Sequence, residues 1–340
     1  MKLCLGGDFS LGDTYLADWA RRPQRREPLE RLQNAPERFV DPVAPFFAAG
    51  RRNIVNLETV LTHAEQSPLE GKKKFLGRDD PARTVALLHR LHVEAVSLAN
   101  NHTRDFGDRG LLDTMHHLAV GNIGFFGAGD RDSAQKPFTL TADTGRRVHV
   151  VGGMRFRSRY ARSYNHFAAT GNFGIGAFRA ATMVERIETL RRDDPEAFIV
   201  VFPHWGTDYE LRSDGMRGSA ERWVAAGADL IVGHGTHVLT EIECIDGVPV
   251  CYSLGNLVFN SPGRYQRFGI HPYSAVAHVD VGNEGLEALR LYPVVTDNRR
   301  TGFRTRPADA RESRFCHERL CDDAFALDRD ALGWHLAFAR

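Results

Sequence analysis

Five apolar runs in the sequence are each followed by side chains that can bind a metal ion or transfer a proton. These side chains belong to Asp8, Glu58, Asn101 with His102, His204, and His234 with His237. In an α/β sheet the carboxyl ends of parallel strands meet along one edge, so residues far apart in the sequence can converge there. Mixed carboxylate, amide and imidazole groups suit Mn²⁺ or Zn²⁺, and a site built mostly from oxygens suits Mg²⁺ or Ca²⁺. The pattern therefore predicts a site for one or two divalent ions.

Two of these histidines have a carboxylate a few residues further along the chain. Asp105 follows His102 by three residues, and Asp208 follows His204 by four. A histidine oriented by a carboxylate can act as a general acid or base near neutral pH. We therefore predict His102, Asp105, His204 and Asp208 as catalytic residues; the alternative is that the two aspartates only cap loops or helices.

The candidate site requires a scaffold of parallel strands, and the first two thirds of the chain show the alternating pattern of βα units. Strands are expected at 2–6, 53–57, 93–98, 123–126, 148–151, 198–202, 229–232 and 248–253, and helices near 36–49, 81–91, 110–119, 179–192 and 217–226. Hairpins at 242–253 and 274–295 then indicate two packed sheets flanked by helices. We expect a catalytic domain over residues 1–306 and a helical extension, packed on it, over 307–340.

Composition limits the possible partners. The 340 residues carry 44 Lys and Arg against 43 Asp and Glu, a net charge of +1, so no global field attracts nucleic acid or an anionic membrane. No apolar run approaches the roughly 18 residues of a membrane span. The first residues leave no room for a secretory signal, and the five cysteines show no Cys-x-x-Cys spacing. We therefore expect a cytoplasmic protein with no nucleic-acid or membrane partner; the oligomeric state is left open.

The motifs around the candidate ligands, taken together and in order, resemble one family. They are Gly7-Asp8, Asn56-Leu57-Glu58-Thr59, Leu98-Ala99-Asn100-Asn101-His102, Pro203-His204-Trp205-Gly206, the run from Gly227 to His234 with His237-Val238-Leu239, and Tyr252-Ser253-Leu254-Gly255-Asn256. They resemble the CapA-like (poly-γ-glutamate capsule biosynthesis) family of the calcineurin-like metallophosphatase superfamily. The resemblance implies an α/β fold of the four-layer αββα sandwich type with a divalent-metal site.

The resemblance also implies individual roles for the candidate residues. Its metal ligands would be Asp8, Asn101, His204, His234 and His237, with Glu58 as the bridging carboxylate and His102 as the proton donor. Two positions depart from the two-metal phosphatases: Ser10 stands where they have a histidine, and Gly235-Thr236 puts one extra residue between His234 and His237. These departures favour a single ion at least as much as a full two-metal centre.

Substrate contacts are expected from residues beside this site. The segment 154–164 interleaves four arginines with aromatic residues, so Arg157 and Arg159 are candidates to bind substrate carboxylates, and a solvated loop is the alternative. Trp205 and Asn256 are further candidates to contact substrate. The lysines at 72–74 are expected to be solvated, and the alternative is that they present cations near the rim of the site.

The reaction follows from a metal ion beside histidines. We expect an enzyme acting on a peptide, with Cα epimerisation of a lasso-peptide precursor as the specific reaction, because the family includes such epimerases and the phosphatase motif is incomplete. The alternatives are a metal-dependent phosphoesterase or poly-γ-glutamate-related hydrolase, and a non-catalytic protein that binds a peptide or polymer.

Overall fold

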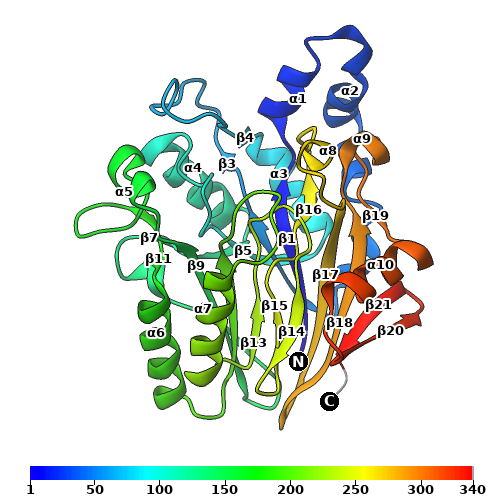
Figure 1. Cartoon of the computed structure of the whole chain (residues 1–340). Coiled ribbons are helices and arrows are strands. Elements are labelled where there is room, and N and C mark those ends of the chain that lie inside the picture. Colours follow the sequence, from blue (N-terminus) through cyan, green and yellow to red (C-terminus); the bar gives the residue numbers. More distant parts are fainter. Residues whose placement is uncertain (339–340) are drawn as a thin grey trace.

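Two large β-sheets pack face to face in the computed structural model, which describes residues 1–338 (Figure 1). The first has ten strands in the order β20-β21-β18-β17-β1-β2-β5-β6, with β16 paired to β1 and β19 to β18. Their bounds are β20 Phe325–Asp330, β21 Gly333–Phe338, β18 Gly285–Val295, β17 Tyr273–Gly282, β1 Lys2–Ser10, β2 Arg52–Leu57, β5 Val93–Ser97, β6 Gly124–Phe126, β16 Asn256–Phe259 and β19 Arg306–Pro307.

The second large sheet has seven strands in the order β11-β9-β12-β13-β15-β14, with β8 paired to β9. Their bounds are β11 Ala177–Phe178, β9 Arg147–Arg155, β12 Phe198–His204, β13 Leu230–Val232, β15 Val248–Cys251, β14 Ile242–Ile245 and β8 Phe138–Thr141. Two short pairs lie outside the large sheets: β3 Val60–Leu61 with β4 Arg78–Asp79, and β7 Ala128–Gly129 with β10 Gly174–Ile175.

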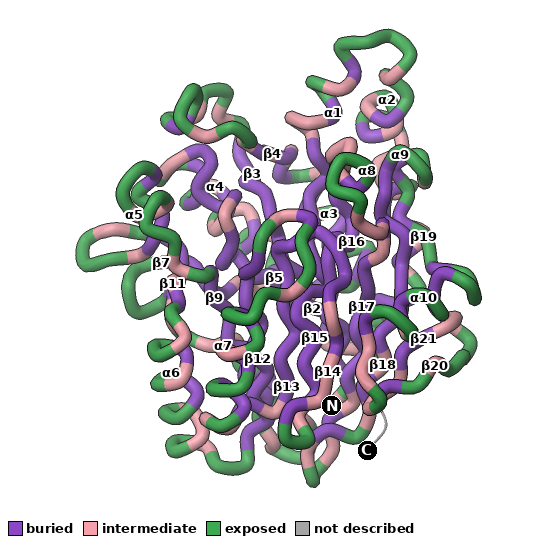
Figure 2. Tube along the Cα trace, in the orientation of Figure 1, coloured by how far each residue is buried: buried purple, intermediate pink, exposed green. Residues whose placement is uncertain are grey.

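The helices are α1 Asp13–Trp19, α2 Glu27–Asn34, α3 Pro81–Arg90, α4 Gly107–Val120, α5 Ser158–Tyr164, α6 Ala180–Asp193, α7 Asp214–Ala225, α8 Tyr265–Phe268, α9 Asn298–Thr301 and α10 Ala310–Leu320. Of these, α3 and α4 cover the outer face of the first sheet and α6 and α7 cover that of the second, whereas α1 and α2 lie beyond the ends of the strands (Figure 1). Short 3₁₀ turns occur at η1 Pro23–Arg25, η2 Pro36–Phe39, η3 Ala44–Phe46 and η4 Ser133–Gln135. The central strands are buried along most of their length, whereas α6 and α7 expose one side to solvent (Figure 2).

Three apolar clusters define the layers. Alternate residues of a strand enter different clusters: Leu3 and Leu5 of β1 meet Val200 and Phe202 of β12 between the two sheets, while Cys4 faces the opposite side. That opposite side packs against helices α3 and α4, and the outer face of the second sheet packs against α6 and α7. Strands buried on both faces by this arrangement are typical of parallel sheets. The layers confirm the expected four-layer αββα sandwich.

Two expected helical segments differ from the structure. Residues 36–49 form the turns η2 and η3 rather than an α-helix, because Pro36, Pro42 and Pro45 remove backbone donors and break a regular helix. The extension after residue 306 is helical only in α10. It continues into the hairpin β20-β21, which joins the first sheet through β18, so it extends the sheet as well as packing on the molecule. None of the helices within residues 1–338 has the length and apolar composition needed to cross a membrane.

Candidate metal centre

Strand register brings the candidate ligands to one edge of the sandwich. Asp8 of β1 is aligned with Asn56 of β2 on one side and with Asn256 of β16 on the other. In the opposing sheet, the parallel pairing of β12 with β13 ends in a bridge between His204 and His234. The two sheets therefore present their polar strand ends to each other, as the sequence predicts.

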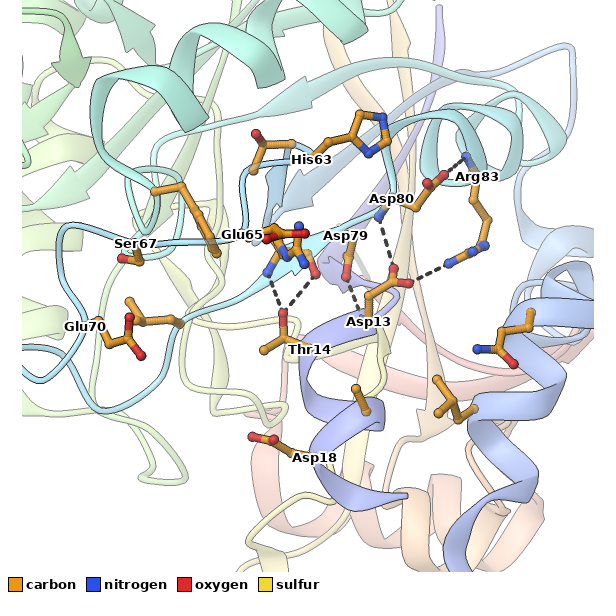
Figure 3. Close-up of a pocket in the computed structure, with 17 residues that line it drawn as sticks. Asp13, Thr14, Asp18, His63, Glu65, Ser67, Glu70, Asp79, Asp80 and Arg83 are labelled. Carbon is orange, nitrogen blue, oxygen red and sulfur yellow. Dashed lines mark hydrogen bonds and ion pairs between the residues drawn. The ribbon is translucent and has the colours of Figure 1, made fainter. Parts of the chain in front are cut away.

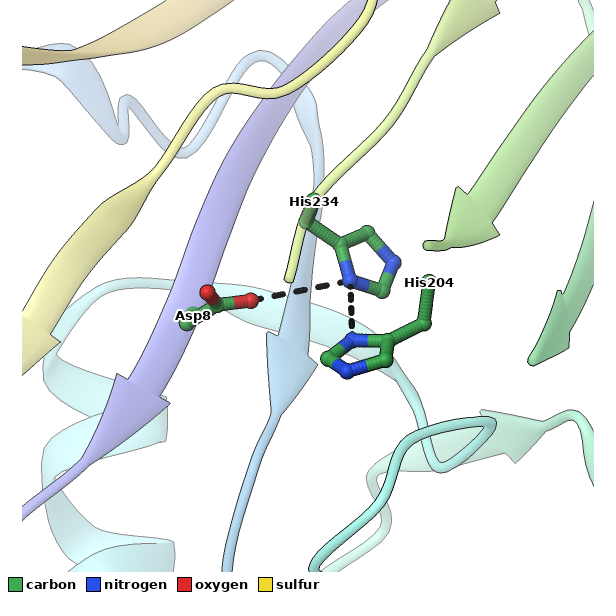
Figure 4. Close-up of side chains that lie close together, drawn as sticks. All are labelled: Asp8, His204 and His234. Atoms are coloured by element: carbon green, nitrogen blue, oxygen red, sulfur yellow. Dashed lines mark hydrogen bonds and ion pairs between the residues drawn. The ribbon is translucent and has the colours of Figure 1, made fainter. Parts of the chain in front are cut away.

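Asp8, His204 and His234 form one group of possible metal ligands (Figure 4). Each offers one ligand atom, and these atoms lie within 4.8 Å of one another. The Nδ1 atom of His234 is 3.6 Å from Asp8 Oδ1 and 2.9 Å from Nδ1 of His204. All three side chains are buried, and they come from both sheets.

A second group combines the same aspartate with Glu58 and His237. Nδ1 of His237 lies 3.3 Å from Asp8 Oδ2 and 4.0 Å from Glu58 Oε2. The other carboxylate oxygen of Glu58 is 3.9 Å from Nε2 of His204, so Glu58 also borders the first group. Asp8 is common to both groups, whereas the family resemblance assigns the bridging position to Glu58. Asp8 is therefore the shared carboxylate, whereas Glu58 belongs to the second group and borders the first.

Unpartnered buried atoms test whether these residues suit a cation. Within residues 1–338, Asp8 Oδ2 and both carboxylate oxygens of Glu58 are buried without a hydrogen-bond partner. Leaving a buried carboxylate oxygen unpartnered is costly, because the group has lost its hydration without compensation. A divalent ion would satisfy such atoms, and carboxylate with imidazole is a donor set that Mn²⁺ or Zn²⁺ accepts. The residues present therefore fit a metal ion.

The pKa values at the centre follow from burial and from the close carboxylates. Burial and the neighbouring Asp8 raise the pKa of Glu58 well above its ordinary value. Burial lowers the pKa of His234 to about 4, and burial together with His234 lowers that of His204 well below its ordinary value. Burial opposes protonation of His237 as well, but Glu58 and Asp8 outweigh it and raise its pKa. Neutral His204 and His234 have the protonation state required of metal ligands.

His102 and Asp105 form the expected proton-transfer pair. Nδ1 of His102 is 2.6 Å from Oδ2 of Asp105, and its Nε2 is 4.0 Å from Glu58 Oε1. Lys73 forms a buried ion pair with the other oxygen of Asp105 and donates to the carbonyl of Asn101 at 2.6 Å. Burial opposes ionisation of Asp105, but Lys73 and His102 outweigh it and lower its pKa. An ionised Asp105 can only accept, so Nδ1 of His102 donates to it and Nε2 faces the metal centre.

The two asparagines near the centre hold histidines in place. Oδ1 of Asn101 is 2.7 Å from Nε2 of His204, so both ring nitrogens of His204 are engaged within the site. Asn256, expected to contact substrate, is instead buried: its Oδ1 is 2.9 Å from Nδ1 of His237, and its amide donates to the hydroxyl of Tyr265. Asn256 therefore orients a candidate ligand.

A comparison with protein families identifies the scaffold that carries this centre. The model of the bacterial capsule synthesis protein family PGA_cap matches residues 2–261, about three quarters of the chain. The chain belongs to the PGA_cap family. The match spans the candidate ligands from Asp8 to His237 and ends before the β17-β18 hairpin and the C-terminal segment.

Two curated relatives of this PGA_cap chain carry capsule-related names. The PGA biosynthesis protein CapA of Bacillus subtilis is 29% identical over 221 residues, which are 64% of this chain and 56% of that protein. The capsule biosynthesis protein CapA of Bacillus anthracis is 29% identical over 203 residues, 56% of this chain and 48% of that protein. The chain thus spans about half the length of these relatives. Among solved structures, a phosphatase from Mycoplasma pneumoniae is 14% identical, with 89% of this chain and 96% of that chain covered and a TM-score of 0.46.

The expected pair of His204 with Asp208 is not formed in the part of the chain that the structure describes. Asp208 instead makes an ion pair with Arg264, and both nitrogens of His204 point to Asn101 and His234. The spacing of four residues places a partner on one helix face, but His204 ends strand β12 and the residues that follow form a loop, so that spacing has no such consequence here. The pKa of Asp208 is lowered, because His237 and Arg264 outweigh the effect of burial.

The expected substrate-binding residues separate into three kinds. Arg157 donates to the carbonyl of Gly206 and lines a small cavity with His204, close to the centre. Arg159 is exposed on α5, where its guanidinium stacks on Tyr164, so it lies outside the cavities described near the site. The indole of Trp205 packs in the core between Trp223 and Tyr252, and it is only 2% exposed.

A cavity of about 620 Å³ lies between α1 and β4, away from the metal centre (Figure 3). Its acidic residues serve the local structure: Asp13 pairs with Arg83 at 2.6 Å, and Asp80 accepts from the backbone nitrogen of Arg83 at the start of α3. Asp79 accepts from the backbone nitrogens of Leu11 and Asp13. We therefore assign the chemistry to the smaller cavities that contain His102 and His204.

Sequence analysis missed three residues of the site. Lys73 was expected to be solvated, yet its ammonium group is buried on Asp105. Arg264 and Tyr209 flank His237 and Asp208 at the mouth of the site, and neither stands in a motif at the end of a strand. One signal was available for Lys73, because it belongs to the run of lysines directly before Phe75-Leu76-Gly77.

Proposed function

We propose that this protein is a divalent-metal-dependent enzyme that acts on a peptide or peptide-like substrate, with His102 as the group that transfers the proton. One observation carries the proposal: the unpartnered buried carboxylate oxygens of Asp8 and Glu58 lie among His204, His234 and His237, beside the His102–Asp105 pair. Ligands for a Lewis acid and an oriented acid or base are the two parts that such catalysis needs.

The side chains have separable roles in this proposal. Asp8, His204 and His234 would hold one ion, and Asp8, Glu58 and His237 a second, with Asn101 beside His204. A bound ion would polarise a carbonyl or phosphoryl oxygen of the substrate. Asp105 fixes the ring of His102 so that Nε2 faces the substrate, and Lys73 keeps Asp105 in place.

The presence of one proton-transfer pair bears on the type of reaction. Hydrolysis requires one group to donate a proton to the leaving atom, and His102 is placed for that role. Epimerisation through two bases requires a second base on the opposite face, but His204 is assigned here to the ion that it would share with Asp8 and His234. We therefore favour hydrolysis of an amide or phosphoester. The resemblance to the poly-γ-glutamate capsule biosynthesis family makes a γ-linked glutamate polymer one substrate class to test.

Cα epimerisation of a peptide residue, as in a lasso-peptide precursor, is the second candidate. It is favoured by the same His102–Asp105 pair, because His102 could remove the α-proton, and inversion would follow if water delivered a proton to the opposite face of the planar carbon. The two reactions share the metal requirement and the dependence on His102. They differ in whether a bond of the substrate is cleaved.

The test incubates the Mn²⁺-loaded protein in deuterated water with an aryl phosphate, a γ-glutamyl peptide and an α-linked peptide. Cleavage without α-deuterium supports hydrolysis, and α-deuterium without cleavage supports epimerisation. We expect His102→Gln to lower the rate by about 10²- to 10⁴-fold. The matched control is His116→Gln, because His116 lies on the exposed face of α4.

Two results would count against the enzyme. If no substrate changes in the presence of Mn²⁺, Zn²⁺ or Mg²⁺, the catalytic proposal fails. If peptides bind equally well after chelation and in His102→Gln, a non-catalytic binding protein becomes the better description.

A further inference from the structure

An aromatic cavity opens directly onto the candidate catalytic residues. Its volume is about 240 Å³, and His102 and His237 form part of its wall. The aromatic residues that line it are Tyr15, Phe75, Tyr209 and Phe259. The ring centroid of Phe259 lies 4.9 Å from that of His237, and that of Tyr209 lies 5.6 Å from it. Rings from four different parts of the chain therefore surround the approach to the metal centre.

Arg264 forms the cationic part of this wall and is held from two sides. Its guanidinium stacks over the rings of Phe75, Tyr209 and Phe268 at 4.9–5.4 Å and pairs with Asp208. Stacking and ion pairing fix the planar group without needing a ligand. Because Asp208 already balances its charge, Arg264 offers an acidic substrate side chain little net attraction.

The backbone at this cavity is held in an unusual conformation. Tyr209 and His237 both have positive φ, 60° and 65°, although neither is glycine. Such residues cost free energy and occur preferentially at functional sites. The nitrogen of Tyr209 donates to the carbonyl of Thr236 at 2.7 Å, which links the two strained positions. Holding the ring of Tyr209 beside His237 therefore costs conformational free energy.

Solvent exposure is also unusual at the rim. Phe75 is 40% exposed and Phe268 is 44% exposed, and both touch Arg264. Single exposed apolar residues are common, but here two aromatic rings gather at one opening beside titratable groups. An aromatic surface at the entrance to a site is suited to an apolar group of a ligand.

We infer that the aromatic cavity binds an aromatic or branched apolar side chain of the substrate, adjacent to the reacting carbonyl, and selects it over an acidic one. The inference rests on the proposed function, because it places the reacting group at the metal centre. A volume of about 240 Å³ is below the roughly 300–1,000 Å³ of sites that enclose whole drug-sized ligands, so it suits one side chain. An acidic side chain would meet Asp208 and lose hydration among the rings, so a γ-linked glutamate polymer becomes the less favoured of the candidate substrates.

The test measures binding of three probes to the Mn²⁺-loaded full chain by calorimetry: N-acetyl-L-phenylalanine, N-acetyl-L-glutamate and N-acetylglycine. All three probes carry the same α-carboxylate and acetyl group, so differences in their dissociation constants report the contribution of the side chain. We expect the phenylalanine probe to bind roughly 10-fold more tightly than the glycine probe, as one or two favourable aromatic contacts provide. The glutamate probe should bind no more tightly than the glycine probe.

Two variants localise the effect. Phe75→Ala should remove most of the phenylalanine advantage and leave binding of N-acetylglycine unchanged. Phe173→Ala is the matched control, because Phe173 is 44% exposed and does not line the aromatic cavity. Both side chains are exposed, so neither change should disturb folding.

Equal binding of the three probes, tighter binding of the glutamate probe, or an undiminished phenylalanine advantage in Phe75→Ala would overturn the inference. Failure of the proposed function is a separate result. It would appear as a chain that neither binds Mn²⁺ nor turns over any substrate in a His102-dependent way, whatever its preference among the probes.

Discussion

Asp8 is the residue on which both candidate ion positions depend. Its Oδ1 faces His234 and accepts from the amide of Asn56, while its Oδ2 faces His237. Asp8→Asn should therefore abolish tight metal binding at both groups, whereas Glu58→Gln should weaken only the group that contains His237. The measurement is the Mn²⁺ content after equilibrium dialysis, determined by elemental mass spectrometry.

A matched control for these carboxylates is Asp108→Asn, because Asp108 is exposed at the start of α4. Its metal content should equal that of the parent. If Asp8→Asn retained the parent content, the ligand assignment would be incorrect at both groups.

Lys73 stabilises the candidate catalytic pair, His102 and Asp105, through a buried ion pair. Its side chain is 8% exposed and that of Asp105 is 0% exposed. Removing one partner of such a pair leaves an uncompensated buried charge, so Lys73→Met should lower the free energy of unfolding by about 3–5 kcal/mol. Urea denaturation of the metal-free chain measures it.

A double variant distinguishes the loss of this ion pair from a loss of packing around Lys73. Lys73→Met combined with Asp105→Asn should recover part of the lost stability, because the unpaired charge is then removed. Lys72→Met is the control, since Lys72 is exposed, and its stability should lie within about 0.5 kcal/mol of the parent. A double variant less stable than Lys73→Met alone would contradict the argument.

At the scale of elements, a close backbone approach positions Asp8. A Cβ added to Gly7 of β1 would lie 1.8 Å from the carbonyl oxygen of Gly255, and the next residue, Asp8, donates its N–H to that same oxygen at 2.9 Å. Gly7→Ala must therefore push β1 away from the turn before β16. We expect a loss of about 3 kcal/mol in unfolding free energy together with weaker Mn²⁺ binding.

Gly218 of α7 provides the matched glycine. A Cβ there meets no heavy atom within 4 Å, and the residue lies inside a helix. Gly218→Ala should therefore raise stability by about 0.5–1 kcal/mol and leave metal binding unchanged. Urea denaturation of both variants measures these changes. Equal destabilisation by the two substitutions would show that the contact with Gly255 does not cause the loss of stability in Gly7→Ala.

The elements also show which patterns in the sequence are informative. Strands β1, β2, β5, β12 and β13 were predicted because apolar runs followed by polar residues mark buried strands and their ends. The prediction of a helix over 36–49 was wrong, because three prolines prevent a regular helix although the apolar residues have helical spacing. The hairpin β20-β21 was missed because its strands lie at a sheet edge, where most residues of β20 face solvent and apolar alternation is weak.

Across the molecule, the sequence predicts the site residues that directly follow strands, but it does not predict the contacts between loops. Asp8, Glu58, His204, His234 and His237 converge because topology fixes the strand ends at one edge. Lys73 and Arg264 reach their partners across 32 and 56 residues of sequence, and no periodic pattern encodes such contacts between loops. The aromatic cavity is missing from the sequence analysis for the same reason.

The whole sandwich also contains buried neutral histidines that are not among the candidate metal ligands. Burial lowers the pKa of His166 to about 3 and those of His271 and His278 to about 4. In the unfolded chain each would titrate near its ordinary value of about 6.5. Between pH 6.5 and 4 the unfolded state therefore binds more protons, so stability must fall as the pH is lowered through this range.

His278 isolates one part of this pH dependence. Its Nε2 lies 2.8 Å from the carbonyl oxygen of Phe46, and the side chain is 1% exposed. In His278→Gln the amide can keep this hydrogen bond but cannot titrate. As the pH falls from 7 to 4, the free energy of unfolding of the variant should therefore rise relative to that of the parent by up to about 3 kcal/mol. Urea denaturation of the EDTA-treated chains at a series of pH values measures the difference, and the exposed His89→Gln should parallel the parent throughout. A constant offset between His278→Gln and the parent would mean that His278 takes up no proton on unfolding, and the acid sensitivity would then have to come from other groups.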